Sequence, residues 1–189
     1  MKYLIKMLNF SKKYQNEVVS INDIFITNRI TLLLGKNGSG KSTLLKAIGG
    51  LIKYEGSIDL IGKVSYMSEI TSFPDDLTVS EFIYSLSNLS KASVHEKEIE
   101  YLFNNFNMMN KKNELLSSLS KGMKAKVNLI QVLIEQSDIY LLDEPINGLD
   151  KDGIVCLINY LAKSENAFII STHIIDDFKK LKSEVIKIW

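Results

Sequence analysis

The chain has 189 residues, of which 46% are hydrophobic and 24% are charged, and its formal net charge is +1. This length and composition fit one globular domain of ordinary soluble type. A nearly neutral chain gives no electrostatic reason to expect nucleic acid or an anionic membrane surface as the main partner. The single cysteine, Cys156, excludes an internal disulfide framework and fits a reducing compartment.

The first segment, residues 2–27, alternates apolar and polar residues and has no helical pattern. This pattern predicts two antiparallel strands, which would form a small β-lobe ahead of the core. Lysines and Asn9 interrupt the apolar start, so the segment does not resemble a signal peptide. No run in the chain approaches the ~20 apolar residues needed to cross a bilayer. A role at a membrane would therefore require a partner.

The rest of the chain alternates short apolar runs with longer helical patterns. The short runs, which are typical of strands buried on both faces of a parallel sheet, cover residues 30–34, 138–142, 166–171 and 184–189. The helical patterns cover residues 41–52, 120–136, 151–163 and 174–182. This alternation predicts a layered α/β domain with a mostly parallel sheet. Residues 78–119 have helical spacing without a convincing strand, which predicts a helical insertion.

A glycine-rich segment with the pattern GxxxxGKS follows the expected strand at 30–34 and precedes a helical run. Glycines allow backbone N–H groups to turn inward and surround phosphate oxygens at a helix N-terminus. A lysine then supplies positive charge to the β- and γ-phosphates, and a serine supplies a hydroxyl to Mg²⁺. The alternative is a turn that merely starts a helix, but the strand–loop–helix setting favours a nucleotide site. Its residues are Gly35, Lys36, Asn37, Gly38, Ser39, Gly40, Lys41, Ser42 and Thr43.

An apolar run ends in two acids, Asp143 and Glu144. Acids at the carboxyl end of a strand face the crevice in which ligands bind to open α/β sheets. We expect Asp143 to hold Mg²⁺, directly or through water, and Glu144 to polarise the attacking water. The alternative is that the two acids simply end the strand in solvent, which the phosphate-binding pattern makes the weaker interpretation.

These motifs resemble those of the ATP-binding-cassette (ABC) ATPases, and the resemblance runs over nearly the whole chain. The family's signature, usually LSGGQ, is similar to the segment LSKGM at residues 119–123, which precedes a helical run. The segment departs from the signature at Lys121 and Met123. It keeps Ser120 and Gly122, which the resemblance implies contact the γ-phosphate bound by a second protomer. Ser120 is also a good N-cap for the helix and can serve both purposes.

Three further positions match the family, and a fourth departs from it. Asp150 ends a segment that resembles the D-loop at the dimer interface, and His173 matches the histidine that contacts the γ-phosphate. Tyr14 matches the aromatic residue that stacks on adenine. Glu69 stands where the family commonly has glutamine, near the metal and the attacking water, and its charge should make metal contact sensitive to pH. The alternatives are a structural histidine, simple packing of the tyrosine and an exposed loop acid.

The resemblance also divides the single domain. It implies a β-lobe start at 1–29, a phosphate-loop core with a short β excursion at 30–68, a helical lobe at 69–119, and the signature helix with the remaining core at 120–189. We interpret most apolar residues of the helical lobe as lobe core, with a few forming a groove for a permease helix. We interpret the cluster Lys121, Lys124 and Lys126 as a solvated face.

By this resemblance the chain is an ATP-binding and ATP-hydrolysing subunit with ATP and Mg²⁺ as cofactors. It would close head to tail with a second ATPase protomer and drive an integral membrane permease from the cytoplasmic face. A signature of the SKGM type is similar to those of exporters, and no nucleic-acid partner is expected. Two alternatives stay open: a cassette ATPase that acts in DNA repair or at the ribosome, and a nucleotide switch with weak turnover. The first usually has coiled-coil arms or tandem cassettes, and Glu144 and His173 argue against the second.

Overall fold

The structure is a computed structural model that describes residues 3–15, 17–69, 72–89 and 96–189. Its centre is a five-stranded sheet with the order β6-β7-β8-β4-β9, in which every neighbouring pair is parallel. The strands are β4 (Ile30–Leu34), β6 (Val64–Met67), β7 (Ile139–Asp143), β8 (Ala167–Thr172) and β9 (Glu184–Lys187). The four predicted strands are therefore confirmed. Strand β6 was not predicted, because its four residues form no continuous apolar run.

A second, antiparallel sheet forms the β-lobe. It is built on β1 (Ile5–Lys13), which pairs with β2 (Val18–Ile21), β3 (Ile24–Ile26) and β5 (Glu55–Leu60). The sequence predicted two strands before residue 28, and the structure has three. The second predicted strand is divided at Asn22 and Asp23, where the Asp23 carboxylate accepts a hydrogen bond from the backbone N–H of Asn9 at 2.8 Å.

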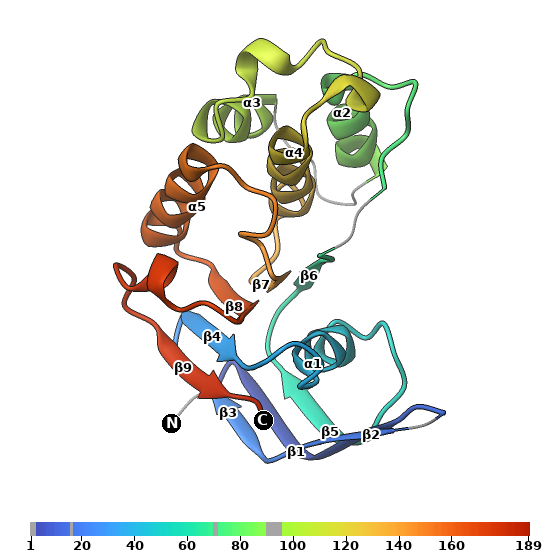
Figure 1. Ribbon diagram of the computed structural model, residues 1–189, viewed down its shortest axis with the longest axis vertical. Coiled ribbons are helices and arrows are strands. Elements are labelled where there is room, and N and C mark those ends of the chain that lie inside the picture. Colours follow the sequence, from blue (N-terminus) through green and yellow to red (C-terminus); the bar gives the residue numbers. More distant parts are fainter. Residues whose placement is uncertain (1–2, 16, 70–71, 90–95) are drawn as a thin grey trace.

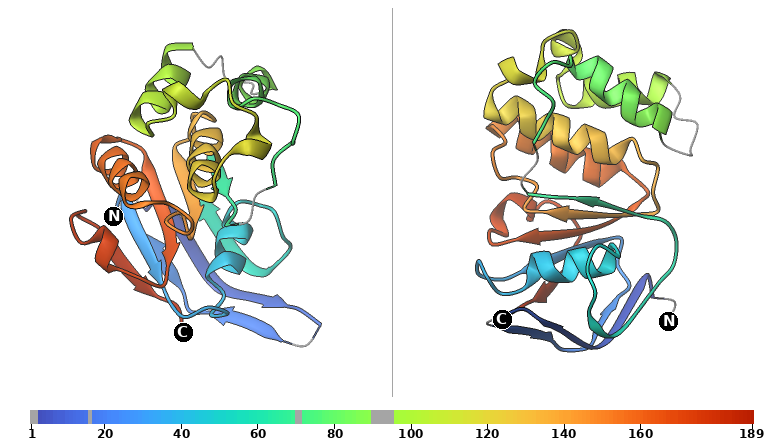
Figure 2. Two further views of the ribbon diagram at one scale, coloured as in Figure 1. Left: turned by 45° about the horizontal axis from the view of Figure 1, so that its top comes forward. Right: turned by 90° about the vertical axis from the view of Figure 1, so that its right-hand side faces the viewer.

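The two sheets and the helices form stacked layers (Figure 1). Helix α1 (Lys41–Ile48) lies between the antiparallel sheet and one face of the parallel sheet, and the three elements share an apolar core. Helices α4 (Lys121–Leu133) and α5 (Lys151–Lys163) cover the opposite face. Figure 2 shows this succession edge-on, with α2 (Val79–Leu89) and α3 (Glu96–Asn105) as the outermost layer above α4. The fold is thus α/β with a small antiparallel lobe.

The helical insertion predicted over 78–119 contains α2, α3 and two short 3₁₀ helices, Met109–Lys111 and Leu116–Ser118. Residues 90–95 of this stretch lie outside the described part of the chain. At the start of α2, the side chain of Thr78 accepts from the N–H of Glu81, and the side chain of Glu81 accepts from the N–H of Thr78. These two hydrogen bonds form a capping box. Among the described residues, no helix is long and apolar enough to cross a membrane.

The helix predicted over 174–182 is wrong, because only a 3₁₀ turn forms there, at Asp176–Phe178. The hydroxyl of Thr172 accepts a hydrogen bond from the N–H of Ile174 at 3.1 Å and donates one to its carbonyl at 2.8 Å. That carbonyl is consequently occupied at the point where a helix would begin. Burial of Phe178 accounts for the apolar spacing that suggested a helix.

Strand β8 offers a direct test of the parallel sheet as the core of the fold. Ile170 is fully buried between β4 and β7, whereas Val185 on the edge strand β9 is 38% exposed. We expect Ile170→Ala to lower the free energy of unfolding by about 2–5 kcal/mol through lost burial and a residual cavity. The matched Val185→Ala change should cost clearly less. Chemical denaturation measures both, and equal losses would contradict this layering.

Candidate active site

Three segments meet at the carboxyl edge of the parallel sheet. The phosphate loop, residues 35–43, follows β4, the two acids Asp143 and Glu144 stand at the end of β7, and Ser171 and His173 stand at the end of β8. The register of β7 and β8 brings the carboxyl ends of these two strands together, because Asp143 pairs with Ser171. The strand order therefore gathers residues that are far apart in the sequence.

The phosphate loop closes around the side chain of Lys41. Its ammonium group donates to the carbonyls of Gly35 at 2.8 Å and Lys36 at 3.1 Å and lies 3.5 Å from Oε1 of Glu144. Gly40, which is the N-cap of α1, has a φ of 95°, and a Cβ there would lie 2.5 Å from the side chain of Val19. The loop therefore needs glycine at this position, both for the backbone angle and for the approach of the β-lobe.

A hollow of about 250 Å³ opens over this loop. Its lining includes the loop itself, the two acids Glu69 and Glu144, and His173. The β-lobe contributes Glu17 and Val19 from the other side. The predicted phosphate-binding and catalytic groups are thus gathered around one space, although they come from four separate parts of the chain.

The carboxylate of Asp143 is almost completely buried and is held by three hydroxyl groups. Ser42 and Ser171 donate to its Oδ1 at 3.0 and 2.6 Å, and Tyr66 donates to its Oδ2 at 3.1 Å. Burial, and then the nearby charge of Asp143, raises the pKa of Tyr66 above its usual value. The phenol therefore stays protonated and remains a donor at neutral pH.

Glu144 has an unusual backbone conformation. Its φ is +47°, in the left-handed region that non-glycine residues rarely adopt, and its N–H donates to the hydroxyl of Ser171 at 2.9 Å. Its Oε2 lies 3.0 Å from Nδ1 of His173, while its Oε1 lies beside Lys41. This turn separates the side chains of consecutive acids, so that Asp143 stays in the sheet edge and Glu144 reaches the hollow.

The residues at this edge fit a magnesium-bound nucleotide. The buried Ser39 Oγ has no hydrogen-bond partner among the described residues, and Glu144 Oε1 has only the Lys41 ammonium, 3.5 Å away. Buried polar atoms without hydrogen bonds are uncommon. Within the described residues, no group of three or more His, Cys, Asp or Glu side chains is placed to hold a metal ion. Mg²⁺ does not need such a group, because it binds through one or two carboxylates and the phosphates of its substrate. Ser42 and Asp143 are the groups positioned to contribute.

Tyr14 and Glu69 lie at the margins of the site. The Tyr14 hydroxyl is 3.1 Å from Oγ1 of Thr43, at the end of the phosphate loop, and its ring is 38% exposed beside Lys12. The Glu69 carboxylate accepts a hydrogen bond from the side-chain amide of Asn147 at 2.9 Å. Both predicted residues are therefore brought to the site, and the roles assigned to them stay predictions.

Ser120, Gly122 and Asp150 do not line the hollow over the phosphate loop. Ser120 is the N-cap of α4 and accepts from the N–H of Met123 at 3.3 Å, and Asp150 is the N-cap of α5. A Cβ on Gly122 would lie 3.4 Å from the carbonyl of Gly148. These three residues thus lie at the starts of α4 and α5, outside that hollow.

Sequence reasoning missed Tyr66, Ser171 and Val19. No motif marks them, since each matters only through a neighbour that the fold brings to it. The interpretation of Lys121, Lys124 and Lys126 as a solvated face is wrong for Lys126, which is 6% exposed. It is paired with Asp150, and a paired lysine can be buried.

Comparison with known proteins gives one consistent result. The family model described as ABC transporter matches residues 21–147. An uncharacterized ABC transporter ATP-binding protein of Methanocaldococcus jannaschii is 32% identical over 98% of this chain and 74% of its own length. The bacitracin transport ATP-binding protein BcrA of Bacillus licheniformis is 30% identical over 98% of this chain and 66% of its own length. A solved structure described as the ATP binding subunit of an ABC transporter superposes with a TM-score of 0.81 at 25% identity, over 98% of this chain and 85% of that one.

Ser171 gives the sharpest test of this geometry, because one hydroxyl serves both acids. Ser171→Ala should leave the buried N–H of Glu144 without its partner and Asp143 without its shortest hydrogen bond. We expect the free energy of unfolding to fall by about 1–3 kcal/mol and the Mg²⁺ concentration needed for half-maximal ATP turnover to rise. Denaturation and a Mg²⁺ titration measure the two effects. An unchanged Mg²⁺ dependence would contradict a positioning role for this hydroxyl.

Proposed function

The chain belongs to the ABC transporter family, and we propose that it is the subunit whose ATP hydrolysis drives export through a separate membrane permease. The family membership makes it an ATP-binding ATPase. The observation that carries the catalytic part of the proposal is the position of Glu144, whose two carboxylate oxygens lie beside Lys41 and His173 over the phosphate loop. A carboxylate that can orient water and cationic or hydrogen-bonding groups that stabilise charge on the phosphate oxygens are what phosphoryl transfer to water uses.

The phosphate loop holds the substrate in this proposal. Backbone N–H groups of residues 35–43 surround the phosphates, and Lys41 exchanges its present carbonyl partners for phosphate oxygens. Tyr14 stacks on the adenine ring from the β-lobe. Ser42 and Asp143 would hold Mg²⁺, which would neutralise charge on the phosphates. Glu69 would contribute a further carboxylate near the metal.

Glu144 acts as the general base. Its left-handed backbone directs the carboxylate into the hollow, and strained conformations of this kind concentrate at functional sites. The carboxylate orients the attacking water and accepts its proton. His173, bonded to the same carboxylate, steadies it and donates to the γ-phosphate during the reaction. Lys41 offsets the charge that accumulates on the phosphate oxygens.

A second protomer completes each site. Ser120 and Gly122 lie outside the hollow of their own chain, and they begin a helix whose N-terminus attracts anions. In a head-to-tail dimer they contact the γ-phosphate held by the partner, while Asp150 belongs to the loop that crosses the interface. Each chain therefore supplies its phosphate loop and Glu144 to one ATP molecule, and Ser120 and Gly122 to the other.

The permease is the partner that turns this cycle into transport. Helices α2 and α3 form the outermost layer beyond α4 (Figure 1). In this proposal they supply the groove in which the permease docks. The chain then works on the cytoplasmic face of the membrane, attached through that partner. Export is favoured by the SKGM-type signature at residues 120–123, and no nucleic acid takes part.

Removing the base tests the dimer and the role of Glu144 together. Glu144→Gln should block proton transfer but leave nucleotide binding, so that Mg-ATP accumulates in a closed dimer. The matched change Glu165→Gln, at an exposed acid remote from the site, should stay monomeric under turnover conditions. Size-exclusion chromatography with light scattering measures the mass. A Glu144→Gln protein that stays monomeric with saturating Mg-ATP would contradict head-to-tail closure.

A further inference from the structure

Lys126 is a buried cation in the signature helix α4. Its side chain is 8% exposed, and its ammonium group lies 3.2 Å from Oδ1 and 3.3 Å from Oδ2 of Asp150. Within the described part of the chain this is the only ion pair that Lys126 makes. A buried charge is unfavourable unless a counter-charge matches it. The position of Lys126 therefore depends on Asp150, which lies in the loop of residues 147–150.

Asp150 has two partners at once. It is the N-cap of α5, where its Oδ1 accepts from the N–H of Gly153 at 2.6 Å, and it also receives the charge of Lys126. The hydrogen bond from Gly153, and then the contact with Lys126, lowers the pKa of Asp150. The carboxylate therefore stays ionised at neutral pH. It accepts the hydrogen bond from Gly153 within α5 and pairs with the ammonium group of Lys126 on α4.

Lysine side chains of α4 lie close to two glycines, one in the 147–150 loop and one in α5. A Cβ on Gly153 would lie 2.9 Å from Cε of Lys126, and a Cβ on Gly148 would lie 3.2 Å from Cε of Lys121. Gly148 also has a φ of 85°, which favours glycine. The first two turns of α4 therefore pack against the 147–150 loop and the start of α5.

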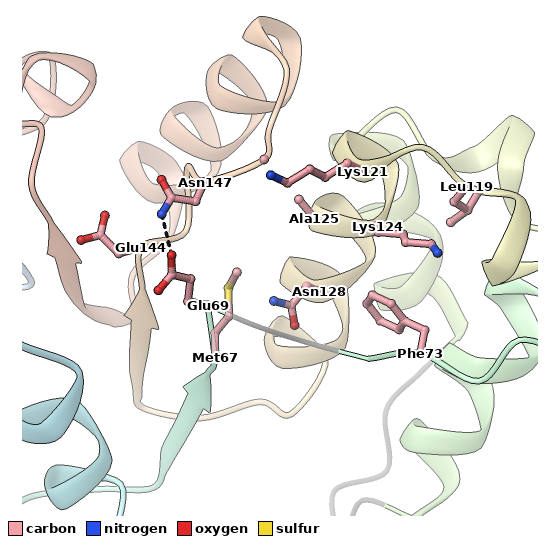
Figure 3. A pocket seen from close by; sticks show the side chains of 11 residues that line it. Met67, Glu69, Phe73, Leu119, Lys121, Lys124, Ala125, Asn128, Glu144 and Asn147 are labelled. Carbon is pink, nitrogen blue, oxygen red and sulfur yellow. Dashed lines mark hydrogen bonds between the residues drawn. The ribbon is translucent and has the colours of Figure 1, made fainter. Parts of the chain in front are cut away.

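The same helix is joined to the loop that follows β6. The side-chain amide of Asn128 donates to the carbonyl of Ser68 at 3.0 Å, and Glu69 accepts from Asn147 at 2.9 Å. These contacts border a hollow of about 470 Å³, which Glu144 also lines (Figure 3). The signature helix, the loop after β6 and the 147–150 loop are thus connected in a ring beside the catalytic acid.

We propose that Lys126 is a positioning residue that holds the signature helix and the 147–150 loop as one rigid surface for the partner protomer. It touches neither nucleotide nor metal, and it acts through Asp150. The inference rests on the proposed head-to-tail dimer. Without the ion pair, the direct link between these two segments is lost, so their relative position is less fixed and closure must order it at an entropic cost.

The experiment compares variants in the Glu144→Gln background, in which the closed dimer accumulates. Lys126→Met keeps the aliphatic length and removes the charge, Lys126→Arg keeps the charge, and Lys163→Met makes the same change at an exposed lysine on α5. Binding of a fluorescent ATP analogue is measured at a protein concentration at which the parent is monomeric. The dimer dissociation constant is measured separately by sedimentation with saturating Mg-ATP.

For Lys126→Met we expect nucleotide affinity within twofold of the parent and a dimer dissociation constant raised about tenfold or more. Lys126→Arg should recover most of the dimerisation, and Lys163→Met should match the parent. Asp150→Asn should melt at a lower temperature than the double variant with Lys126→Met, because the single change leaves a buried cation without its counter-charge.

Three results would overturn the inference. Unchanged dimerisation in Lys126→Met would overturn the inference but would leave the proposed dimer unaffected. A parallel loss of nucleotide binding and dimerisation would also do so, since it would indicate general damage to the fold and no specific effect on the interface. A parent that never dimerises would overturn the proposed function, and the inference with it.

Discussion

The burial of one carboxylate, that of Asp143, is the constraint on which the site depends. A charge inside a protein is tolerated only where hydrogen-bond donors replace water, and here three hydroxyls do so. Ser42 comes from α1, Tyr66 from β6 and Ser171 from β8. The carboxylate can meet all three only if β7 lies between β6 and β8 and if α1 begins at the edge of the sheet. The hydrogen bonds to this one carboxylate therefore align the phosphate loop with Asp143 and Glu144.

Glu144, the proposed general base, takes its position from this arrangement. Glu144 follows Asp143 directly, and its N–H bonds to the same Ser171 hydroxyl that holds the buried carboxylate. A left-handed turn then directs its side chain to Lys41 and His173, over the hollow. The strain of that turn is local, while the contacts that maintain it belong to the sheet. Further out, the pairing of α4 with the 147–150 loop extends the same ordered region to the surface at which we propose that a second protomer docks.

The core and the main motifs could be predicted because their signals are local. The strand at 30–34 and the phosphate loop at 35–43 lie in one continuous stretch, and the two acids follow another apolar run. The remaining parts depend on contacts between distant segments. Ser171 looks like any strand serine until strand order brings it to Asp143, and Lys126 looks solvated until Asp150 approaches from the next helix. A helix was expected at 174–182 because its apolar spacing is local as well. The hydroxyl of Thr172 instead bonds the backbone of Ile174, so a helix does not begin there.

The most direct measurement is the steady-state ATPase rate of the purified chain and of Glu144→Gln, each with and without Mg²⁺. If Glu144 is the base, turnover of the unchanged chain depends on Mg²⁺, and the glutamine variant loses about 10²-fold or more of it, as expected for removal of a general base. Glu165→Gln serves as the control for charge alone. Turnover that survives in Glu144→Gln at a comparable rate would contradict the assignment of this acid, and turnover independent of Mg²⁺ would contradict the metal site at Ser42 and Asp143.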